Sequence, residues 1–244
     1  MSLNPMHQFE VYRIGPEISF GGIDVSFTNS SFFMMVSALS ILLILFVGTK
    51  KKSFIPSKIQ LLSEMIYNFV AKMINDTAGM KAKPFFPFIF TIFMFVLFCN
   101  MIGMIPYTFT VTSHIIVTFA LASFIFIGVT IIGFINHGIK YLKIFVPSGV
   151  PYVLLPIIVI IEVISYLSRP ISLSVRLFAN MMAGHTMLKV FGGFVISLGF
   201  LGGWLPLSFS VALTGLEILV AFLQAYVFAI LTCIYLNDAL NLHH

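Results

Sequence analysis

Long apolar runs separated by short polar stretches dominate the chain. Predominantly apolar runs cover residues 32–48, 85–107, 114–135 and 207–236. Each is as long as the roughly 17 to 25 residues that a helix needs to cross a bilayer, or longer. Three consecutive lysines, residues 50–52, end the first run. The pattern therefore predicts a membrane-spanning helix in each of these four ranges.

A further apolar stretch, from residue 150 to residue 200, is far longer than the roughly 20 residues that one perpendicular span needs. A helix here either tilts strongly or is broken, and Pro151, Pro156 and Pro170 permit bends. The segment GFLGGWLP, Gly199–Pro206, predicts a turn. We therefore expect residues 150–236 to form a hairpin of two membrane helices.

Residues 53–80 follow a different pattern, because apolar residues recur there every three or four positions between charged ones. Ile59 and Ile66 follow this repeat, whereas Lys58 and Glu64 interrupt it. Such a pattern is typical of an amphipathic helix that lies on a membrane surface. A helix packed on a soluble partner would have the same pattern and is the alternative.

Composition supports a membrane protein. Of the 244 residues, 59% are hydrophobic and 9% are charged, a balance that a soluble core of this size does not require. The two cysteines, Cys99 and Cys233, lie in apolar runs and are predicted to be buried thiols rather than a disulfide. We expect an all-α integral membrane protein with five membrane helices and one amphipathic surface helix, in a single membrane domain that spans residues 1–244.

The distribution of lysine predicts the orientation. Residues 49–84 hold seven lysines and residues 136–149 hold two, whereas 106–113 and 199–206 hold neither lysine nor arginine. The positive-inside rule then places the lysine-bearing segments and the C-terminus inside, and the N-terminal segment, residues 1–30, outside. The net charge of +5 thus reflects membrane edges rather than a nucleic-acid surface. The first 30 residues resemble neither a signal peptide nor a transit peptide, so we expect insertion without a cleaved leader.

Between Glu162 and Lys189, the long apolar stretch carries ionisable groups, which are costly at membrane depth. Glu162, Arg169 and Arg176 recur at seven-residue intervals and therefore share one face of a helix. Ser172 and Asn180 lie one turn on either side of Arg176 on that face. This face therefore presents a permanent cation among polar groups near the middle of the membrane.

A second polar group faces the other way. His185 lies about 180° round the helix from Arg176 and titrates near neutrality. On the last helix, Glu217, Gln224 and Tyr235 follow one stripe. His185 and Glu217 lie at similar distances from the predicted outer turn, so we expect them at the same depth. The sequence thus predicts two polar clusters at opposite depths with an arginine between them.

Three segments resemble signature segments of subunit a of the F-type ATP synthase, most closely in its alphaproteobacterial and mitochondrial branch. They are LSVRLFANMMAGH (173–185), GLEILVAFLQAYVFAILTCIYL (215–236) and FTNSSFFM (27–34). The resemblance extends over essentially the whole chain. It implies a proton-translocating stator beside a c-ring of small hairpin subunits, with a peripheral stalk subunit b and membrane lipids as further partners. It also implies that the last two membrane helices are long and tilted, and that the membrane is a bacterial plasma membrane or a mitochondrial inner membrane.

The resemblance also implies roles for particular residues. We expect no cofactor, and no metal at His185, because Lys189 occupies the place one turn away that a second ligand would need. Arg176 matches an essential cation that faces the c-ring. Together with the predicted depths, the resemblance assigns His185, Glu217, Asn180 and Gln224 to an outer half-channel and Glu162, Ser172 and Tyr235 to an inner one. An arginine stays protonated at any working pH, so it cannot relay a proton. It can hold a ring carboxylate ionised and repel a proton that would leak across.

Other interpretations remain open at this point. Arg176 could simply pair with Glu162 or Glu217, and Arg169 could have a structural role. His185 could be a packing histidine, whereas His114 and His137 are expected to face water at helix ends. For the whole chain, the alternatives are a stand-alone secondary proton or ion transporter or antiporter subunit, and a purely structural membrane anchor. Transporters tend to contain inverted repeats, which we do not find in this sequence.

Overall fold

The computed structural model describes residues 8–17, 19–20, 23–24, 26–50, 57–105, 108–146 and 154–241. Their α-helices are α1 (Asn29–Lys50), α2 (Lys58–Ala78), α3 (Phe86–Gly103), α4 (Ile115–His137), α5 (Leu155–Gly202) and α6 (Trp204–Leu240). Short 3₁₀ helices are η2 (Met80–Phe85), η3 (Val111–Ser113) and η4 (Gly138–Phe145), and β1 (Ser19–Phe20) pairs with β2 (Ile23–Asp24). Lys51, Lys52 and Pro151 lie outside the described residues.

Five helical stretches are long and apolar enough to cross a membrane: Asn29–Lys50, Met80–Gly103, Ile115–Leu142, Leu155–Gly199 and Trp204–Leu240. The amphipathic helix α2 is not one of them. The predicted fold class, an all-α membrane protein with five membrane helices and one amphipathic helix, is therefore confirmed, apart from the small strand pair near the N-terminus.

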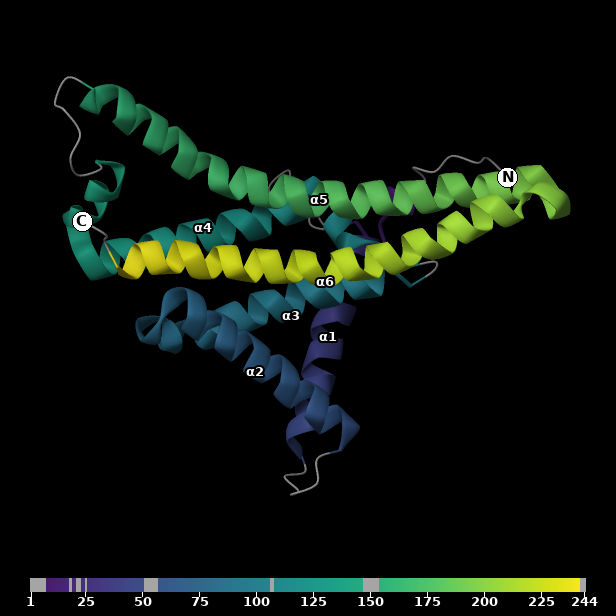
Figure 1. Cartoon of the computed structure of the whole chain (residues 1–244), viewed down its shortest axis with the longest axis horizontal. Coiled ribbons are helices and arrows are strands. Elements are labelled where there is room, and N and C mark those ends of the chain that lie inside the picture. The colour runs from purple at the N-terminus through teal and green to yellow at the C-terminus, as the bar shows by residue number, and fades with distance from the viewer. Residues whose placement is uncertain are drawn as a thin grey trace.

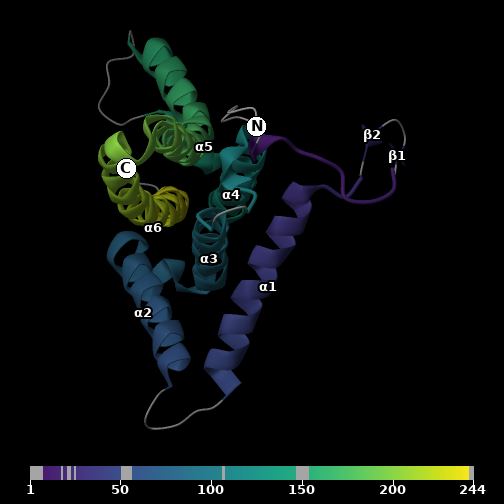
Figure 2. The same cartoon turned by 90° about the vertical axis from the view of Figure 1, so that its right-hand side faces the viewer.

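Helices α3 to α6 lie side by side along the longest axis of the molecule (Figure 1). Helix α1 crosses them steeply, and α1 and α2 form a V whose apex points away from the other helices (Figure 2). The two arms of the V touch where Gly48 leaves no room for a Cβ beside the side chain of Ser63. Four residues at one end of α2, Val70, Met73, Ile74 and Ala78, are buried, whereas Ile59 and Leu62 near its start are exposed.

Helix α5 is continuous in the range where the sequence allowed either a tilted or a broken helix. Pro156 lies in its first turn, where a proline costs no hydrogen bond, and Pro170 is accommodated inside the helix. The 45 residues of its apolar part, Leu155–Gly199, extend roughly 67 Å at 1.5 Å per residue, about twice the ~30 Å hydrocarbon layer. The strongly tilted alternative therefore holds. The predicted turn is also present: Gly199 adopts φ 62°, and α6 begins at Trp204.

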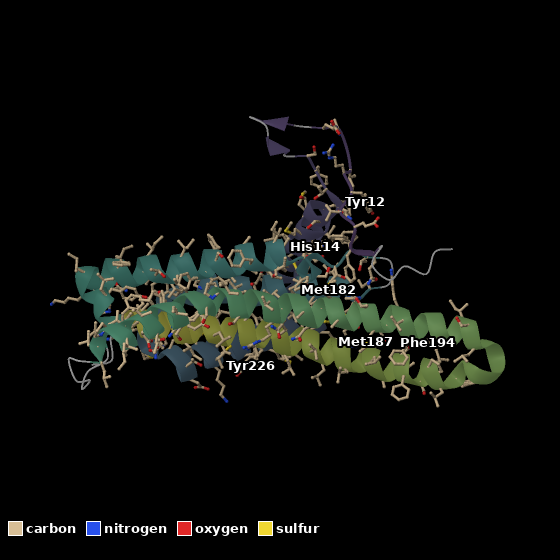
Figure 3. All side chains as sticks on the ribbon, turned by 90° about the horizontal axis from the view of Figure 1, so that it is seen from above. Tyr12, His114, Met182, Met187, Phe194 and Tyr226 are labelled. Carbon is tan, nitrogen blue, oxygen red and sulfur yellow. The ribbon has the colours of Figure 1, made fainter. Side chains whose placement is uncertain are left out.

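The packing of α5 on its neighbours decides which of its faces remains free. Leu173, Leu177 and Met181 recur every four residues and are fully buried. On the facing helix α6, Ala221 and Ala225 are also fully buried, and their small side chains allow the helices to approach closely. The opposite face of α5 is exposed. Both helices also continue past the end of α4, with Phe194 on this extension (Figure 3).

The N-terminal segment folds back on the start of α1. The amide of Ile14 donates to Phe27 at 2.8 Å and that of Asn29 to Tyr12 at 3.1 Å. The Asn29 side chain in turn donates to the carbonyl of Glu10 at 3.1 Å. These contacts fix the segment to the first membrane helix.

Candidate functional site

The two ionisable residues predicted to lie at equal depth are in contact. The His185 Nε2 is 3.6 Å from Glu217 Oε1, and both side chains are nearly buried, 12% and 5% exposed. This close approach of α5 and α6 depends on Gly184, where a Cβ would lie 2.5 Å from the same carboxylate oxygen. The helices thus form a buried pair of groups that can exchange a proton.

A polar loop lies against this pair. The wedge, which we define as residues 108–114, contains η3 and packs against α1, α3, α4 and α5. The Oγ1 of Thr110 lies 3.3 Å from His185 Nε2. The wedge is held by Thr112, which donates to Asn100 at 2.8 Å, while Asn100 donates to the carbonyl of Ala221 at 3.2 Å.

Sequence reasoning missed the wedge and Asn100. It treated residues 106–113 as a loop without lysine or arginine. The available signal was the hydroxyl-rich segment FTVTSH (109–114) next to a lone asparagine in an apolar run.

A second pair of polar groups lies between the arginine and the histidine along α5. The Asn180 amide donates to Gln224 Oε1 at 3.0 Å across the α5–α6 contact. Asn180 is exposed, whereas Gln224 is only 4% exposed. The two predicted residues are thus brought together, and they connect the buried side of the helix pair with its free face.

Arg176 lies on that free face and is exposed. Asn180 and Gln224, the nearest predicted polar groups, bond to each other. Among the described residues, Arg176 also forms no ion pair with Glu162 or Glu217. The purely structural pairing considered above is therefore absent, and the guanidinium is open to a group outside the chain.

The residues predicted for the inner half-channel are less closely associated. Glu162 is half-buried and Ser172 is exposed, and neither has a hydrogen bond or ion pair within the described part of the chain. Tyr235 lies half-buried beneath Arg169, whose guanidinium carbon is 5.0 Å from the ring centroid. Arg169 pairs with Asp238 at 3.2 Å and thereby joins α5 to α6.

Asp238 was missed because the last helix was expected to end at residue 236, whereas it extends to Leu240. Next to this ion pair, the hydroxyl of Tyr166 lies 2.8 Å from that of Thr130 and 2.9 Å from that of Tyr141. These contacts join α4, η4, α5 and α6 at one end of the bundle.

The expectation that His114 faces water is wrong. Its ring stacks on Phe109 at 4.9 Å, and its Nε2 is buried without a described hydrogen-bond partner. This burial lowers the pKa of His114 below its usual value. The other histidine placed at a helix end, His137, is half-buried and contacts the carbonyl of Leu240 at 3.3 Å.

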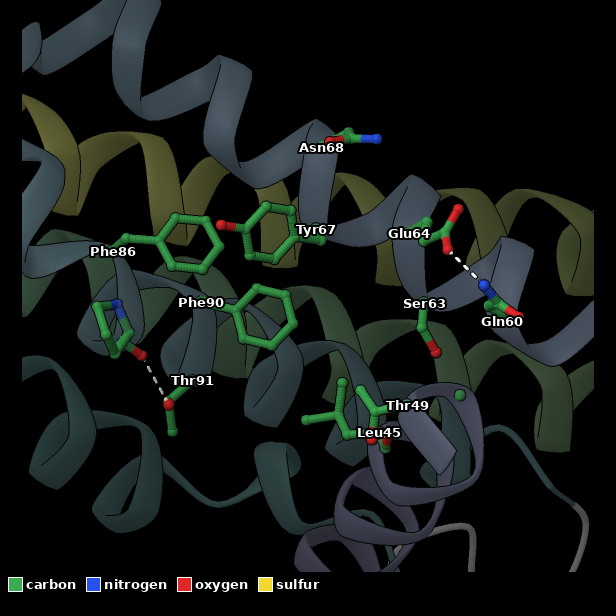
Figure 4. A pocket seen from close by; sticks show the side chains of 12 residues that line it. Leu45, Thr49, Gln60, Ser63, Glu64, Tyr67, Asn68, Phe86, Phe90 and Thr91 are labelled. Atoms are coloured by element: carbon green, nitrogen blue, oxygen red, sulfur yellow. Dashed lines mark hydrogen bonds between the residues drawn. The ribbon is translucent and has the colours of Figure 1, made fainter. Parts of the chain in front are cut away.

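A separate cavity of about 550 Å³ lies between α1, α2 and the start of α3. Tyr67, Phe86 and Phe90 form its apolar wall, and Gln60 donates to Glu64 at its polar rim (Figure 4). None of the candidate site residues lines it. Within the described residues, no three histidine, cysteine, aspartate or glutamate side chains are grouped as metal ligands would be.

Known proteins resemble this chain over its full length. Residues 31–237 match the family described as ATP synthase A chain. The chain is 81% identical to ATP synthase subunit a of Pelagibacter ubique (strain HTCC1062) over 244 residues, all of both chains. It is 58% identical to ATP synthase subunit a of Chelativorans sp. (strain BNC1) over the full length of both. The same identity is found with ATP synthase subunit a of Rhizobium rhizogenes, over 99% of this chain and 98% of the relative.

These matches confirm the resemblance seen in the three sequence segments, and they do not favour a stand-alone transporter. The chain belongs to the ATP synthase A chain family.

Proposed function

We propose that this chain is the proton-translocating stator subunit in the membrane sector of a rotary ATP synthase. It would offer two offset half-channels to the carboxylates of a c-ring and would itself catalyse no reaction; the complex would make ATP. The observation that carries the proposal is the division of α5 into two faces. One face holds the buried His185–Glu217 pair, and the other presents Arg176 with no partner among the described residues.

The outer half-channel would end at the buried pair. A proton that reaches His185 can pass to Glu217, since the two groups lie 3.6 Å apart. The Asn180–Gln224 contact at 3.0 Å then lies between this pair and the free face of α5. Amide groups donate and accept hydrogen bonds without changing charge, so they can order water or a side chain along the last step.

Arg176 would separate the two half-channels. Ala179 and Ala183 are exposed on the same side of α5, so a ring helix can approach closely there. A guanidinium stays charged in such a setting, and it would keep a passing carboxylate ionised until that carboxylate reaches the exit. The same charge repels a proton that would cross directly.

The inner half-channel would run past Glu162, Ser172 and Tyr235. This assignment is supported by the positions of the residues. Glu162 and Ser172 lie on α5 on the other side of Arg176 from His185, and Tyr235 lies on α6 opposite that part of α5. The proposed orientation places the N-terminus outside and the C-terminus inside a bacterial inner membrane. Subunit b and lipids would complete the surroundings.

The test is ATP-driven proton uptake by inverted membrane vesicles that carry the whole complex. His185→Ala and Glu217→Ala should each slow uptake while the complex stays assembled, because each removes one member of the buried pair. Glu64→Ala is the matched control, since this carboxylate is exposed on α2. Normal uptake by both site variants at every pH from about 5 to about 9, where histidine and shifted carboxylates titrate, would contradict the proposal.

A further inference from the structure

The wedge contains buried hydroxyl groups that the proposed proton path does not use. Thr110, Thr112 and Ser113 are 4%, 3% and 3% exposed, and Val111 between them is 1% exposed. A buried hydroxyl is costly unless it has a hydrogen-bond partner. The partners of these hydroxyls therefore indicate what the wedge holds in place.

The position of Thr110 is fixed from several sides. Its carbonyl accepts from Ser113 at 2.6 Å. A Cβ on Gly103 would lie 2.8 Å from its methyl group, so only glycine at that position of α3 gives it space. Thr112 and Asn100 anchor the same loop to α3 and α6.

The Thr110 hydroxyl has two partners of different kinds. It lies 3.4 Å from the carbonyl of Gly103 and 3.3 Å from the Nε2 of His185. A carbonyl oxygen only accepts, so whenever the hydroxyl donates its hydrogen to Gly103, its oxygen is free to accept from an N–H on His185. When Nε2 carries no hydrogen, the same hydroxyl can donate to it instead.

The same nitrogen faces the carboxylate of Glu217. Both oxygens of that carboxylate are buried without a hydrogen-bond partner among the described residues, and Nε2 is 3.6 Å from one of them. A proton on Nε2 thus lies near two acceptors, the Thr110 hydroxyl and this carboxylate, and its transfer to Glu217 needs the 3.6 Å contact to shorten. The charged groups that act on the imidazole are Glu217 from α6 and Lys189 from α5. The only titratable side chain of the wedge, His114, stacks on Phe109.

We propose that Thr110 is a positioning residue for His185, holding the proton-bearing Nε2 against Glu217 and serving the imidazole both before and after transfer. When the imidazolium gives its Nε2 proton to Glu217, the carboxylate becomes a carboxylic acid and Nε2 keeps a lone pair. The hydroxyl then turns from Gly103 and donates to that lone pair. Only a side chain that both donates and accepts can do this. The inference rests on the proposed outer half-channel.

The experiment compares Thr110→Val, Thr110→Ser and Thr118→Val in the whole complex, by ATP-driven proton uptake across a pH series. Valine keeps the shape of threonine without the hydroxyl, and serine keeps the hydroxyl. Thr118 is the control, because it is also buried and its hydroxyl donates only to the backbone carbonyls of His114 and Ile115, not to a ring nitrogen. Thr110→Val should slow uptake roughly 2- to 10-fold, the worth of one hydrogen bond. Thr110→Ser should restore uptake to near the parent rate.

A purely structural role of Thr110 predicts a different result. Loosening of the wedge would lower uptake by the same factor at every pH, whereas loss of a partner of the imidazole changes that factor across the range where histidine titrates. A constant factor, normal uptake by Thr110→Val, or no recovery with serine would each overturn the inference. His185→Ala and Glu217→Ala are measured alongside. If these two slow uptake and Thr110→Val does not, only the role of Thr110 fails; if they pump normally, the half-channel fails.

Discussion

The close approach of Gly184 to Glu217 gives the sharpest mutational prediction. In Gly184→Ala the new Cβ would lie 2.5 Å from Oε1, 2.8 Å from Cδ and 3.1 Å from Cγ of that side chain. An ordinary contact needs at least 3.4 Å, so the carboxylate must retreat by roughly 1 Å. Because Glu217 is nearly buried, its retreat must disturb the 3.6 Å contact with His185, the residue next to Gly184.

The magnitude follows from the cost of overpacking. Forcing an additional methyl group into a packed interior costs about 1 to 3 kcal/mol. A cost of this size would reduce the fraction of complexes that keep the present His185–Glu217 geometry roughly 5- to 150-fold. We therefore expect ATP-driven proton uptake by Gly184→Ala vesicles to fall at least about 5-fold, with normal amounts of assembled complex.

Gly192→Ala is the matched control, since a Cβ there meets nothing within 4 Å. Both substitutions replace a helical glycine in α5, so both gain the same ~1 kcal/mol of helix propensity. The comparison therefore isolates the contact with Glu217. Equal uptake by the two variants would refute the reasoning, because the buried pair would then tolerate displacement.

Three other predictions concern single residues. Arg176→Lys should abolish coupled ATP synthesis in vesicles under an imposed potential, because a desolvated lysine can lose its proton. Arg176→Ala should also add a passive proton leak. Near-normal ATP synthesis by the lysine variant would contradict this prediction. Glu162→Cys should react with small hydrophilic thiol reagents from the inner side only, and labelling from outside alone would contradict both its depth and the orientation. Burial lowers the pKa of His114, so its contribution to stability is complete above its usual pKa of 6.5 and is lost as the pH falls below it. The midpoint of thermal inactivation should accordingly fall less between pH 7.5 and about pH 5 in His114→Phe than in the parent; an equal fall would contradict the assignment.

Periodicity and length were sufficient to predict most of the fold. Apolar runs gave the spans, and the lysine-ended first run matches α1. The seven-residue spacing placed Arg176 on the exposed face of α5, but Arg169, a member of the same series, is half-buried and pairs with Asp238 of α6. Similar distances from the two ends of the turn Gly199–Pro206 placed His185 and Glu217 at the same depth, which agrees with their contact.

The positions of loops and helix ends could not be predicted from the sequence. Thr110 meets His185 across 75 positions, a distance that no local pattern encodes. Asp238 lies beyond the last predicted helix, which was expected to end at residue 236. Its ion pair with Arg169 forms only when α5 and α6 pack together, so no local pattern indicates it. His114 was expected in water for the same reason: its burial depends on the stack with Phe109 and on neighbouring helices.

The length of α5 also determines how the membrane potential acts along it. With the ends of its 45-residue apolar part at the two faces of a ~30 Å layer, each residue advances only about 0.7 Å in depth. The nine residues from Arg176 to His185 then span about a fifth of the potential, which is worth about 0.5 kcal/mol per charge at 100 mV. The same nine residues cover about 12 Å parallel to the membrane plane. A tilted helix of this kind thus separates its charged groups mainly within the membrane plane and only slightly along the potential. Most of the voltage drop therefore falls outside the segment between the His185–Glu217 pair and Arg176.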